Sequence, residues 1–591
     1  MIIKDRIEKL RNLMKKKNID YYIVPSGDFH QSEYVSDYFK ARAYITGFTG
    51  SAGTALIGMN KAILWTDGRY FIQAEKQLEG SGVELYKMRI PGWPTLDEWL
   101  MDNMKEGETL GFDGKLFSAN EYKEFKKIED KKNIKISMDK DLIGEIWMDR
   151  PELPKDKIFI HDTKYCGKSA KEKINEVRNE MSKLGGQTYV ISSLDDIAWL
   201  YNIRGNDVKD TPVALSYAIV NENEAKLYID KNKVSDNDEK ALKSEGIIIK
   251  GYEDIFKDIE SIDTSTILDP NKISGYIYKT IVKNVKVIEG INITTKLKAI
   301  KNYTEIQSLK NCQIKDGVAM VRFFKWLKET VGKEKITELT VSDKLLEFRS
   351  MGDLFIEESF GTIAGYKDHA AMMHYSATEE SAYELDKEGI LLVDSGGQYL
   401  DGTTDITRSF ILGNITEEEK RDFTLVLKSH IGLMKAKFLE GTTGSNVDIL
   451  ARSALWNEGI DYKCGTGHGV GFFLSVHEGP QTIRPIPNTV ELEPGMILTN
   501  EPGVYKEGKH GIRTENVMLV VEDKNSEEFG KFYKFEVMSY CPIDLSGIEI
   551  SLLSDGERQW LNDYHAETYR KLSPYLNEDE KAFLKEETRA I

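Results

Sequence analysis

The sequence is poor in cysteine and lacks any long apolar run. Only four cysteines occur among 591 residues, far apart and without a CxxC pair. This spacing argues against a disulfide framework or a zinc ribbon and fits a reducing cytoplasm. No stretch approaches about eighteen consecutive apolar residues, so we expect no transmembrane helix. The first residues also lack the apolar core of a signal peptide and are typical of an amphipathic helix.

A basic surface is also missing. The chain has 80 Lys and Arg residues against 97 Asp and Glu residues, a formal net charge of −17. This excess of acid disfavours nucleic acid or an anionic membrane as a partner, because both require positive charge. The hydrophobic content of 40% is ordinary for a globular protein, and a chain of this length should divide into several domains. We therefore expect a cytoplasmic, multidomain α/β protein.

Two segments in the first half resemble each other. Residues 6–26 and 173–193 both read as a helix followed by a buried strand, and further strand-like sequence follows each of them. We interpret them as two copies of an α/β domain, at 1–155 and 156–300, with chance similarity as the alternative. At a constant offset, Ile7, Arg11, Asn12, Met14, Tyr22 and Ser26 match Ile174, Arg178, Asn179, Met181, Tyr189 and Ser193.

Helix-start patterns mark the remaining divisions. Thr304 and Gln307 resemble a capping box at the start of a third domain, for which we predict the bounds 301–545. The segment 546–591 has aromatic residues and helical spacing, so we expect a packed helical extension. Two more capping-box patterns occur there, formed by Ser554 with Glu557 and by Asn577 with Glu580.

Five residues of the third domain form a candidate metal-binding set. Asp394, Asp405, His468, Glu501 and Glu515 supply four carboxylates and one imidazole. Such a set suits two adjacent hard or borderline divalent ions, whereas zinc alone would more often recruit several histidines or thiolates. Two neighbouring ions can activate one water molecule and polarise a carbonyl group. The set therefore predicts a hydrolase.

The two aspartates are placed by strands. Asp394 ends the apolar stretch 389–394, and Asp405 begins the next strand after a segment rich in turn signals. An eleven-residue separation across a hairpin can place both carboxylates side by side. Taken alone, two aspartates near a hairpin are usually solvated.

The other ligands also have distinctive settings. Glycines surround His468, so the backbone can approach a ligand closely. A phosphate-binding GxGxxG fails there, because the required glycine is replaced in both registers. Glu501 follows a strand, and we predict that 511–516 is a second strand with Arg513 and Glu515 on the same face. Arg513 can then hold the ligating carboxylate of Glu515 in place, although a surface salt bridge would explain the pair equally well.

Two further histidines, His374 and His477, stand near this set in the sequence. A lone histidine is more often structural, but two beside a dinuclear centre favour proton transfer or carbonyl stabilisation. Other catalytic signatures fail. The segment 49–53 lacks the first glycine of a nucleophile elbow, and His477-Glu478 has no second histidine three residues later.

At these motifs the chain resembles the Xaa-Pro aminopeptidases (aminopeptidase P), in particular their large three-domain cytosolic form. The resemblance covers nearly the whole chain. It rests on Tyr44-Ile45-Thr46-Gly47-Phe48-Thr49-Gly50-Ser51-Ala52-Gly53, Trp65-Thr66-Asp67-Gly68-Arg69-Tyr70, Ile197-Ala198-Trp199-Leu200-Tyr201-Asn202-Ile203-Arg204-Gly205, Gly467-His468-Gly469-Val470-Gly471, His477-Glu478-Gly479-Pro480, Asn500-Glu501-Pro502-Gly503, Arg513-Thr514-Glu515-Asn516, Trp560-Leu561-Asn562 and Tyr564-His565.

The resemblance implies two creatinase-like domains before a pita-bread catalytic domain, and a homodimer. It also implies a centre of two divalent ions, usually Mn²⁺, that cleaves peptides with proline in the second position. Asp394 would bind one ion and His468 with Glu501 the other, while Asp405 and Glu515 would bridge them.

By the same resemblance, Glu501 is the general base for the metal-activated water. His374 and His477 would contact the substrate and stabilise the tetrahedral intermediate. One departure is Cys464, four residues before His468, where many members of the family carry a histidine. A thiol is no cationic donor at neutral pH, so a substrate contact at this position is in doubt. A soft metal ligand is the rival interpretation of Cys464.

Three other functions compete with an aminopeptidase. Prolidase shares the catalytic fold but cleaves only dipeptides, and its usual form lacks the second N-terminal domain and the C-terminal extension. Methionine aminopeptidase needs no such large leading region. A non-catalytic scaffold of this fold, as in some histone-chaperone relatives, typically loses the metal ligands, whereas all five are present in this sequence.

Overall fold

The computed structural model describes residues 2–524 and 528–591, which form two compact units. The first unit comprises Met1–His161 and Lys168–Thr295, and the second comprises Asp162–Gly167 and Lys296–Ile591. In the described part of the chain, no helix has both the length and the apolar character needed to cross a membrane.

The first unit contains two six-stranded mixed sheets with the same topology. Their strand orders are β4-β3-β2-β1-β5-β6 and β12-β11-β10-β8-β13-β14, and corresponding neighbours run in the same relative directions. The prediction of two related α/β domains is confirmed, while the boundary residues stay a prediction. The strands are β1 Tyr21–Pro25, β2 Thr54–Gly58, β3 Ala62–Thr66, β4 Glu84–Lys87, β5 Thr109–Gly111, β6 Lys135–Ser137, β8 Thr188–Ile191, β10 Ser216–Asn221, β11 Ala225–Ile229, β12 Ile247–Lys250, β13 Thr266–Leu268 and β14 Val287–Glu289.

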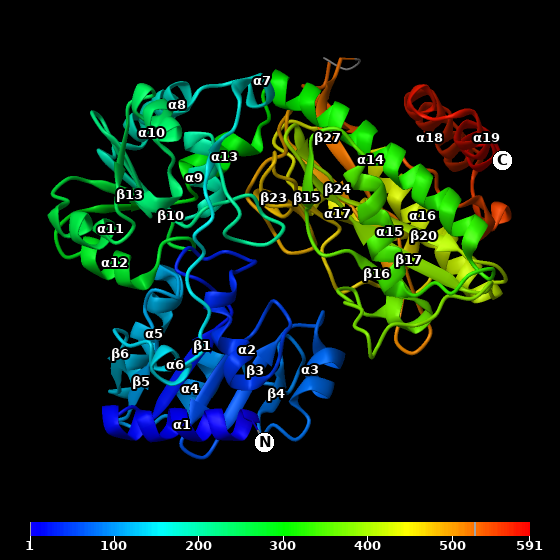
Figure 1. The fold of residues 1–591 in the computed structure, drawn as a ribbon. Helices are drawn as coiled ribbons and strands as arrows, with labels where there is room; N and C mark the ends of the chain where they lie inside the picture. Colours follow the sequence, from blue (N-terminus) through cyan, green and yellow to red (C-terminus); the bar gives the residue numbers. More distant parts are fainter. Residues whose placement is uncertain (1, 525–527) are drawn as a thin grey trace. The chain divides into compact units, whose positions relative to one another are not determined.

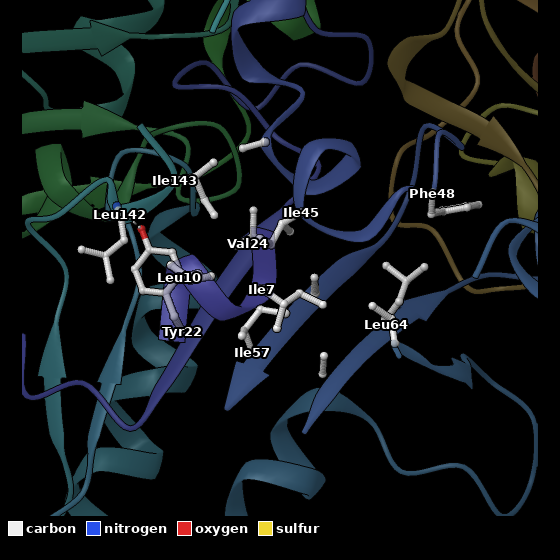
Figure 2. Packing of buried hydrophobic residues seen from close by; sticks show 14 of the residues in the cluster. Ile7, Leu10, Tyr22, Val24, Ile45, Phe48, Ile57, Leu64, Leu142 and Ile143 are labelled. Carbon is white, nitrogen blue, oxygen red and sulfur yellow. Dashed lines mark hydrogen bonds between the residues drawn. The ribbon is translucent and has the colours of Figure 1, made fainter. Parts of the chain in front are cut away.

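The amphipathic first helix closes the core of the first sheet. Apolar residues at helical spacing on α1 (Ile2–Lys17) are buried against the sheet face, where Tyr22 and Val24 alternate with residues that point away. Each such side chain contributes roughly 1.5–3 kcal/mol on burial. Figure 2 shows this packing around Ile7, Leu10, Tyr22, Val24, Ile57 and Leu64.

The second unit holds two main antiparallel sheets. One has the order β16-β17-β20, and the other has the order β21-β28-β27-β24-β22-β23. A two-stranded hairpin, β25-β26, follows β24 and precedes β27 of the larger sheet in the sequence. The bounds are β16 Ile363–Tyr366, β17 Ile390–Ser395, β20 Ile406–Ile411, β21 Lys437–Leu439, β22 Gly467–Gly469, β23 Glu478–Ile483, β24 Ile497–Asn500, β25 Gly503–Lys506, β26 His510–Arg513, β27 Asn516–Asp523 and β28 Phe532–Val537.

Both faces of the larger sheet are covered by helices. Alternation along β24 sends Ile497 toward a cluster that includes Leu309 of α14 (Tyr303–Thr330). Leu498 points the opposite way, toward residues of α16 (Glu417–Met434) and α17 (Gly444–Trp456). The smaller sheet is covered by α14 and α15 (Glu338–Ser350). This arrangement confirms the predicted pita-bread fold.

The capping boxes locate the helix starts, with one correction. The predicted box at Thr304 is wrong, because α14 begins two residues earlier and its box pairs Asn302 with Glu305. The predicted boxes of the C-terminal extension are present at the starts of α18 (Asp555–Leu572) and α19 (Glu578–Glu587). Apolar residues of both helices pack against α14, so the extension is part of the folded unit (Figure 1).

Candidate metal centre

The two aspartates lie on neighbouring strands of the smaller sheet. Asp394 is on β17 and Asp405 immediately precedes β20, and the register pairs Asp394 with Thr407. The antiparallel pairing is as predicted, but the connection is no simple hairpin. Its residues form β18 (Gly397–Tyr399) and β19 (Gly402–Thr403), which belong to another sheet. The turn signals in this segment therefore mark two additional short strands.

His468 comes from the middle of β22 in the larger sheet. Its Nδ1 lies 2.9 Å from the carbonyl oxygen of Gly469, and its Nε2 lies 3.5 Å from both Asp405 Oδ2 and Glu501 Oε1. Because a carbonyl oxygen only accepts, Nδ1 carries the proton and Nε2 presents a lone pair to the carboxylates. A cation between these groups would relieve the repulsion among their lone pairs.

The two glutamates stand just outside strands of the larger sheet. Glu501 follows β24, and Glu515 lies between β26 and β27. The prediction that 511–516 is one strand is wrong, because the chain passes there from the hairpin into the larger sheet. Glu515 is buried, and Thr407 holds it by donating from Oγ1 to its Oε2 at 2.7 Å. Ligand atoms of Asp405, His468 and Glu515 lie within 4.8 Å of one another.

Arg513 orders this set from one side. It is 3% exposed, which rules out a surface salt bridge, and its Nη2 donates to Asp394 Oδ2 at 2.5 Å rather than to Glu515. Its Nε donates to Thr407 Oγ1 at 3.1 Å and its Nη1 to Tyr505 Oη at 2.6 Å. Thr407 thus links the arginine to Glu515. A single rigid guanidinium orients carboxylates from both sheets.

The carboxylates carry more negative charge than their surroundings compensate. Burial raises the pKa of Asp405 and Glu515 well above their usual ranges, and the neighbouring carboxylates raise them further. Burial raises the pKa of Glu501 to about 7, with Arg513 opposing and Asp394 reinforcing the effect. Asp394 Oδ1 is buried without a hydrogen-bond partner among the described residues. An oxygen-rich set with surplus negative charge and a free acceptor fits two divalent cations.

His477 lies beside the cluster. Its ring centroid is 4.3 Å from that of His468, and its charge influences Glu501. Next to it, Glu478 is buried with Lys298, whose Nζ lies 3.1 Å from Oε2, and with Lys301. This buried group of charges fixes the start of β23 and therefore the backbone that carries His477.

The other two candidates from the sequence are His374 and Cys464. His374 is half-buried in the turn after η4 (Lys367–Ala371), a segment that packs against β26. Cys464 is partly buried, and burial together with the charge of Glu501 raises the pKa of its thiol to about 12. The thiol is therefore neutral and close to the carboxylates.

Two residues of the site were not predicted. Thr407 and Tyr505 bind Arg513, and Thr407 also binds Glu515. Strand alternation from Asp405 puts Thr407 on the same face, so the sequence held a signal for it. Tyr505 had no such signal, because its contact depends on the fold of the β25-β26 hairpin.

Comparisons with known proteins give the family. Residues 6–139 and 149–305 match the creatinase/prolidase N-terminal domain, residues 307–522 match metallopeptidase family M24, and residues 531–591 match the C-terminal region of peptidase M24. Aminopeptidase P2 of Arabidopsis thaliana is 41% identical over 98% of this chain and 87% of its own length. Xaa-Pro aminopeptidase 1 of Dictyostelium discoideum is 41% identical over 97% of this chain and 94% of its own.

The chain belongs to the aminopeptidase P family of M24 metallopeptidases. A solved X-prolyl aminopeptidase from Caenorhabditis elegans, described as a cytosolic enzyme with a dinuclear active site, matches all of both chains with a TM-score of 0.96 and 33% identity. An Xaa-Pro dipeptidase from Bacillus anthracis covers 64% of this chain and 99% of its own at 21% identity and a TM-score of 0.51, which shows the shared fold. The predicted family and fold class are confirmed.

Proposed function

We propose that this protein is a metal-dependent aminopeptidase that hydrolyses the bond between an N-terminal residue and a following proline. The main support is the set of four carboxylates and one imidazole in a member of the aminopeptidase P family, with three of the carboxylates buried and Glu501 and His468 partly buried. Its substrates are peptides with proline in the second position, and it acts in the cytoplasm, as the description of the Caenorhabditis elegans relative suggests.

The proposed cofactor is a pair of divalent ions, most consistent with Mn²⁺. Asp394 would hold one ion, His468 and Glu501 the other, and Asp405 and Glu515 both. Four oxygen donors and one imidazole suit manganese better than a metal that prefers thiolates. When bound, such a pair supplies an activated water and a Lewis acid for the scissile carbonyl.

The side chains of the site have separate roles in the proposed reaction. Glu501 would accept the proton of the attacking water as general base. Arg513 holds the carboxylate of Asp394 in a fixed orientation through Nη2. His477, next to His468, and His374 contact the substrate and stabilise the negative charge that forms on the carbonyl oxygen.

An assay of two substrates tests this proposal. The protein should release arginine from Arg-Pro-Pro in the presence of Mn²⁺ and lose this activity in chelator. A prolidase would instead cleave an Xaa-Pro dipeptide and leave Arg-Pro-Pro intact. A non-catalytic scaffold would cleave neither substrate at any manganese concentration.

The metal content gives an independent test. Elemental analysis after reconstitution with manganese should return about two ions per chain, as expected for bridged sites. Glu515→Gln should weaken binding of both ions, because its carboxylate is proposed to contact each of them. One ion or none in the wild-type protein would contradict the dinuclear centre.

We also propose that the protein is a homodimer. On α17, Ile449 and Trp456 lie seven residues apart on one helix face and are 43% and 49% exposed, and the adjacent Leu450 is 39% exposed. An exposed apolar face of this kind suits contact with a second copy of the chain. Light scattering should give twice the chain mass at micromolar concentration, and Trp456→Glu should shift it to the monomer.

A further inference from the structure

A buried arginine lies behind the metal centre. Arg408 is three residues after Asp405 on β20 and is 2% exposed. Its Nη1 donates to the backbone oxygen of Glu515 at 2.6 Å, and its Nη2 donates to Asn516 Oδ1 at 2.8 Å and to Tyr564 Oη at 2.7 Å. One guanidinium therefore joins the strand that follows Asp405, the backbone of Glu515 and the C-terminal helix α18.

A buried histidine extends this network to Glu501. His430 of α16 is 0% exposed, and its Nδ1 lies 3.1 Å from the backbone oxygen of Asn500, the residue before Glu501. Its Nε2 lies 3.2 Å from Asn516 Nδ2, the residue after Glu515. Since the carbonyl only accepts, Nδ1 donates and Nε2 accepts from Asn516. The side-chain amide of Asn500 in turn donates to the backbone oxygen of His430 at 2.9 Å.

The C-terminal extension closes the network through Tyr564. The hydroxyl accepts from Arg408 Nη2 and from the backbone nitrogen of Cys541 at 3.2 Å, and it lies 2.9 Å from the carbonyl oxygen of Cys541, to which it can donate. Its ring stacks on Trp560 at 5.4 Å, and the ring of Trp560 meets His430 edge-on at 5.8 Å. Two aromatic residues of α18 therefore contact the buried network: Tyr564 contacts Arg408, and Trp560 contacts His430.

We propose that the C-terminal extension positions the metal ligands, with Tyr564 as the positioning residue. Tyr564 fixes Arg408, which holds the backbone at Glu515 directly and, through Asn516 and His430, the backbone at Glu501. Both glutamates lie outside regular strands, so strand pairing alone does not fix the backbone that carries them. Their separation therefore depends on contacts from behind, and a displacement well under 1 Å is enough to weaken a preorganised site. This inference rests on the proposed dinuclear centre.

A purely structural role for Tyr564 predicts a different result. Loss of a buried hydroxyl would then lower the melting temperature by the same amount with and without manganese. If the hydroxyl instead positions the ligands, the affinity for metal falls. The increase in melting temperature on adding manganese then becomes smaller, because that increase depends on the ratio of ion concentration to dissociation constant.

The test compares Tyr564→Phe with Tyr569→Phe. Tyr569 is on the same helix but packs with the cluster around Leu572, whereas Tyr564 belongs to a different apolar cluster. In Tyr564→Phe, the manganese concentration for half-maximal binding should rise and kcat should fall by roughly tenfold to a hundredfold, the usual effect of removing an outer hydrogen bond. KM should change by about twofold at most, because no substrate contact is removed. Tyr569→Phe should match the wild type.

His430→Gln provides a second variant that reaches the network from α16, and it should shift manganese binding in the same direction. The inference would be overturned if Tyr564→Phe lowered the melting temperature equally with and without manganese and left the manganese concentration for half-maximal binding unchanged. A wild-type protein that binds no manganese or cleaves no Xaa-Pro bond would instead reject the proposed function. The two failures are therefore distinguishable.

Discussion

Removing the charge of Glu501 should stabilise the metal-free protein at neutral pH and leave its stability in acid unchanged. Burial raises the pKa of this carboxyl from 4.5 to about 7, even though Arg513 opposes the effect. At about 1.4 kcal/mol for each pKa unit, the change corresponds to roughly 3 kcal/mol. Glutamine is close in shape to the protonated acid. Glu501→Gln therefore isolates the free-energy cost of ionising this buried carboxyl.

The sign follows from proton binding. Without metal, folded Glu501 keeps its proton up to about pH 7, whereas the unfolded chain loses it near pH 4.5. The folded state binds more protons in this window, so its free energy of unfolding falls as the pH rises through it. The variant should therefore equal the wild type near pH 4.5 and exceed it by roughly 3 kcal/mol at about pH 8. The raised pKa values of Asp405 and Glu515 act in the same direction.

Urea denaturation in chelator at several pH values measures this difference. The relevant unfolding transition is the one that moves when manganese is added, because only the metal-binding unit responds. Glu507→Gln, at an exposed position in the turn of the β25-β26 hairpin that follows Glu501, is the matched control and should show no such pH dependence. With manganese present the order should reverse, since the wild type keeps a ligand that the variant lacks. A stability advantage of the variant over the wild type that is no larger at about pH 8 than at about pH 4.5 in chelator would refute this reasoning.

Three further predictions concern neighbouring residues. Replacing His374 or His477 with alanine should leave the metal content, measured by elemental analysis, nearly intact but lower kcat for Arg-Pro-Pro roughly a hundredfold. In the same two assays, His468→Ala should lose both metal and activity. Cys464→Ser should change neither quantity if the neutral thiol only fills space, and loss of metal would favour its role as a ligand. Glu478→Gln should lower the free energy of unfolding by about 3–5 kcal/mol in denaturant titrations, because it leaves two buried lysines without their carboxylate.

Much of the site was predictable because its signals are local. Each proposed ligand stands at the end of an apolar strand or among glycines, and such patterns depend on residues only a few positions apart. The capping boxes of α18 and α19 were identified for the same reason, since the side chains and backbone groups involved lie within one turn. The errors also have local causes. Asn302 competes with Thr304 as a helix cap, and the turn signals after Asp394 fit short strands as well as a hairpin.

The sequence by itself determined the repeated α/β domains and the family and led to the proposed ligand set, because strand alternation and helix spacing depend on neighbouring residues. Only the tertiary structure decided which groups hold these ligands. Arg513 pairs with Asp394 across 119 positions and Arg408 meets Tyr564 across 156. These contacts form where separate sheets and the C-terminal helix pack together. No local periodicity encodes them, because the partners become neighbours only when the chain folds.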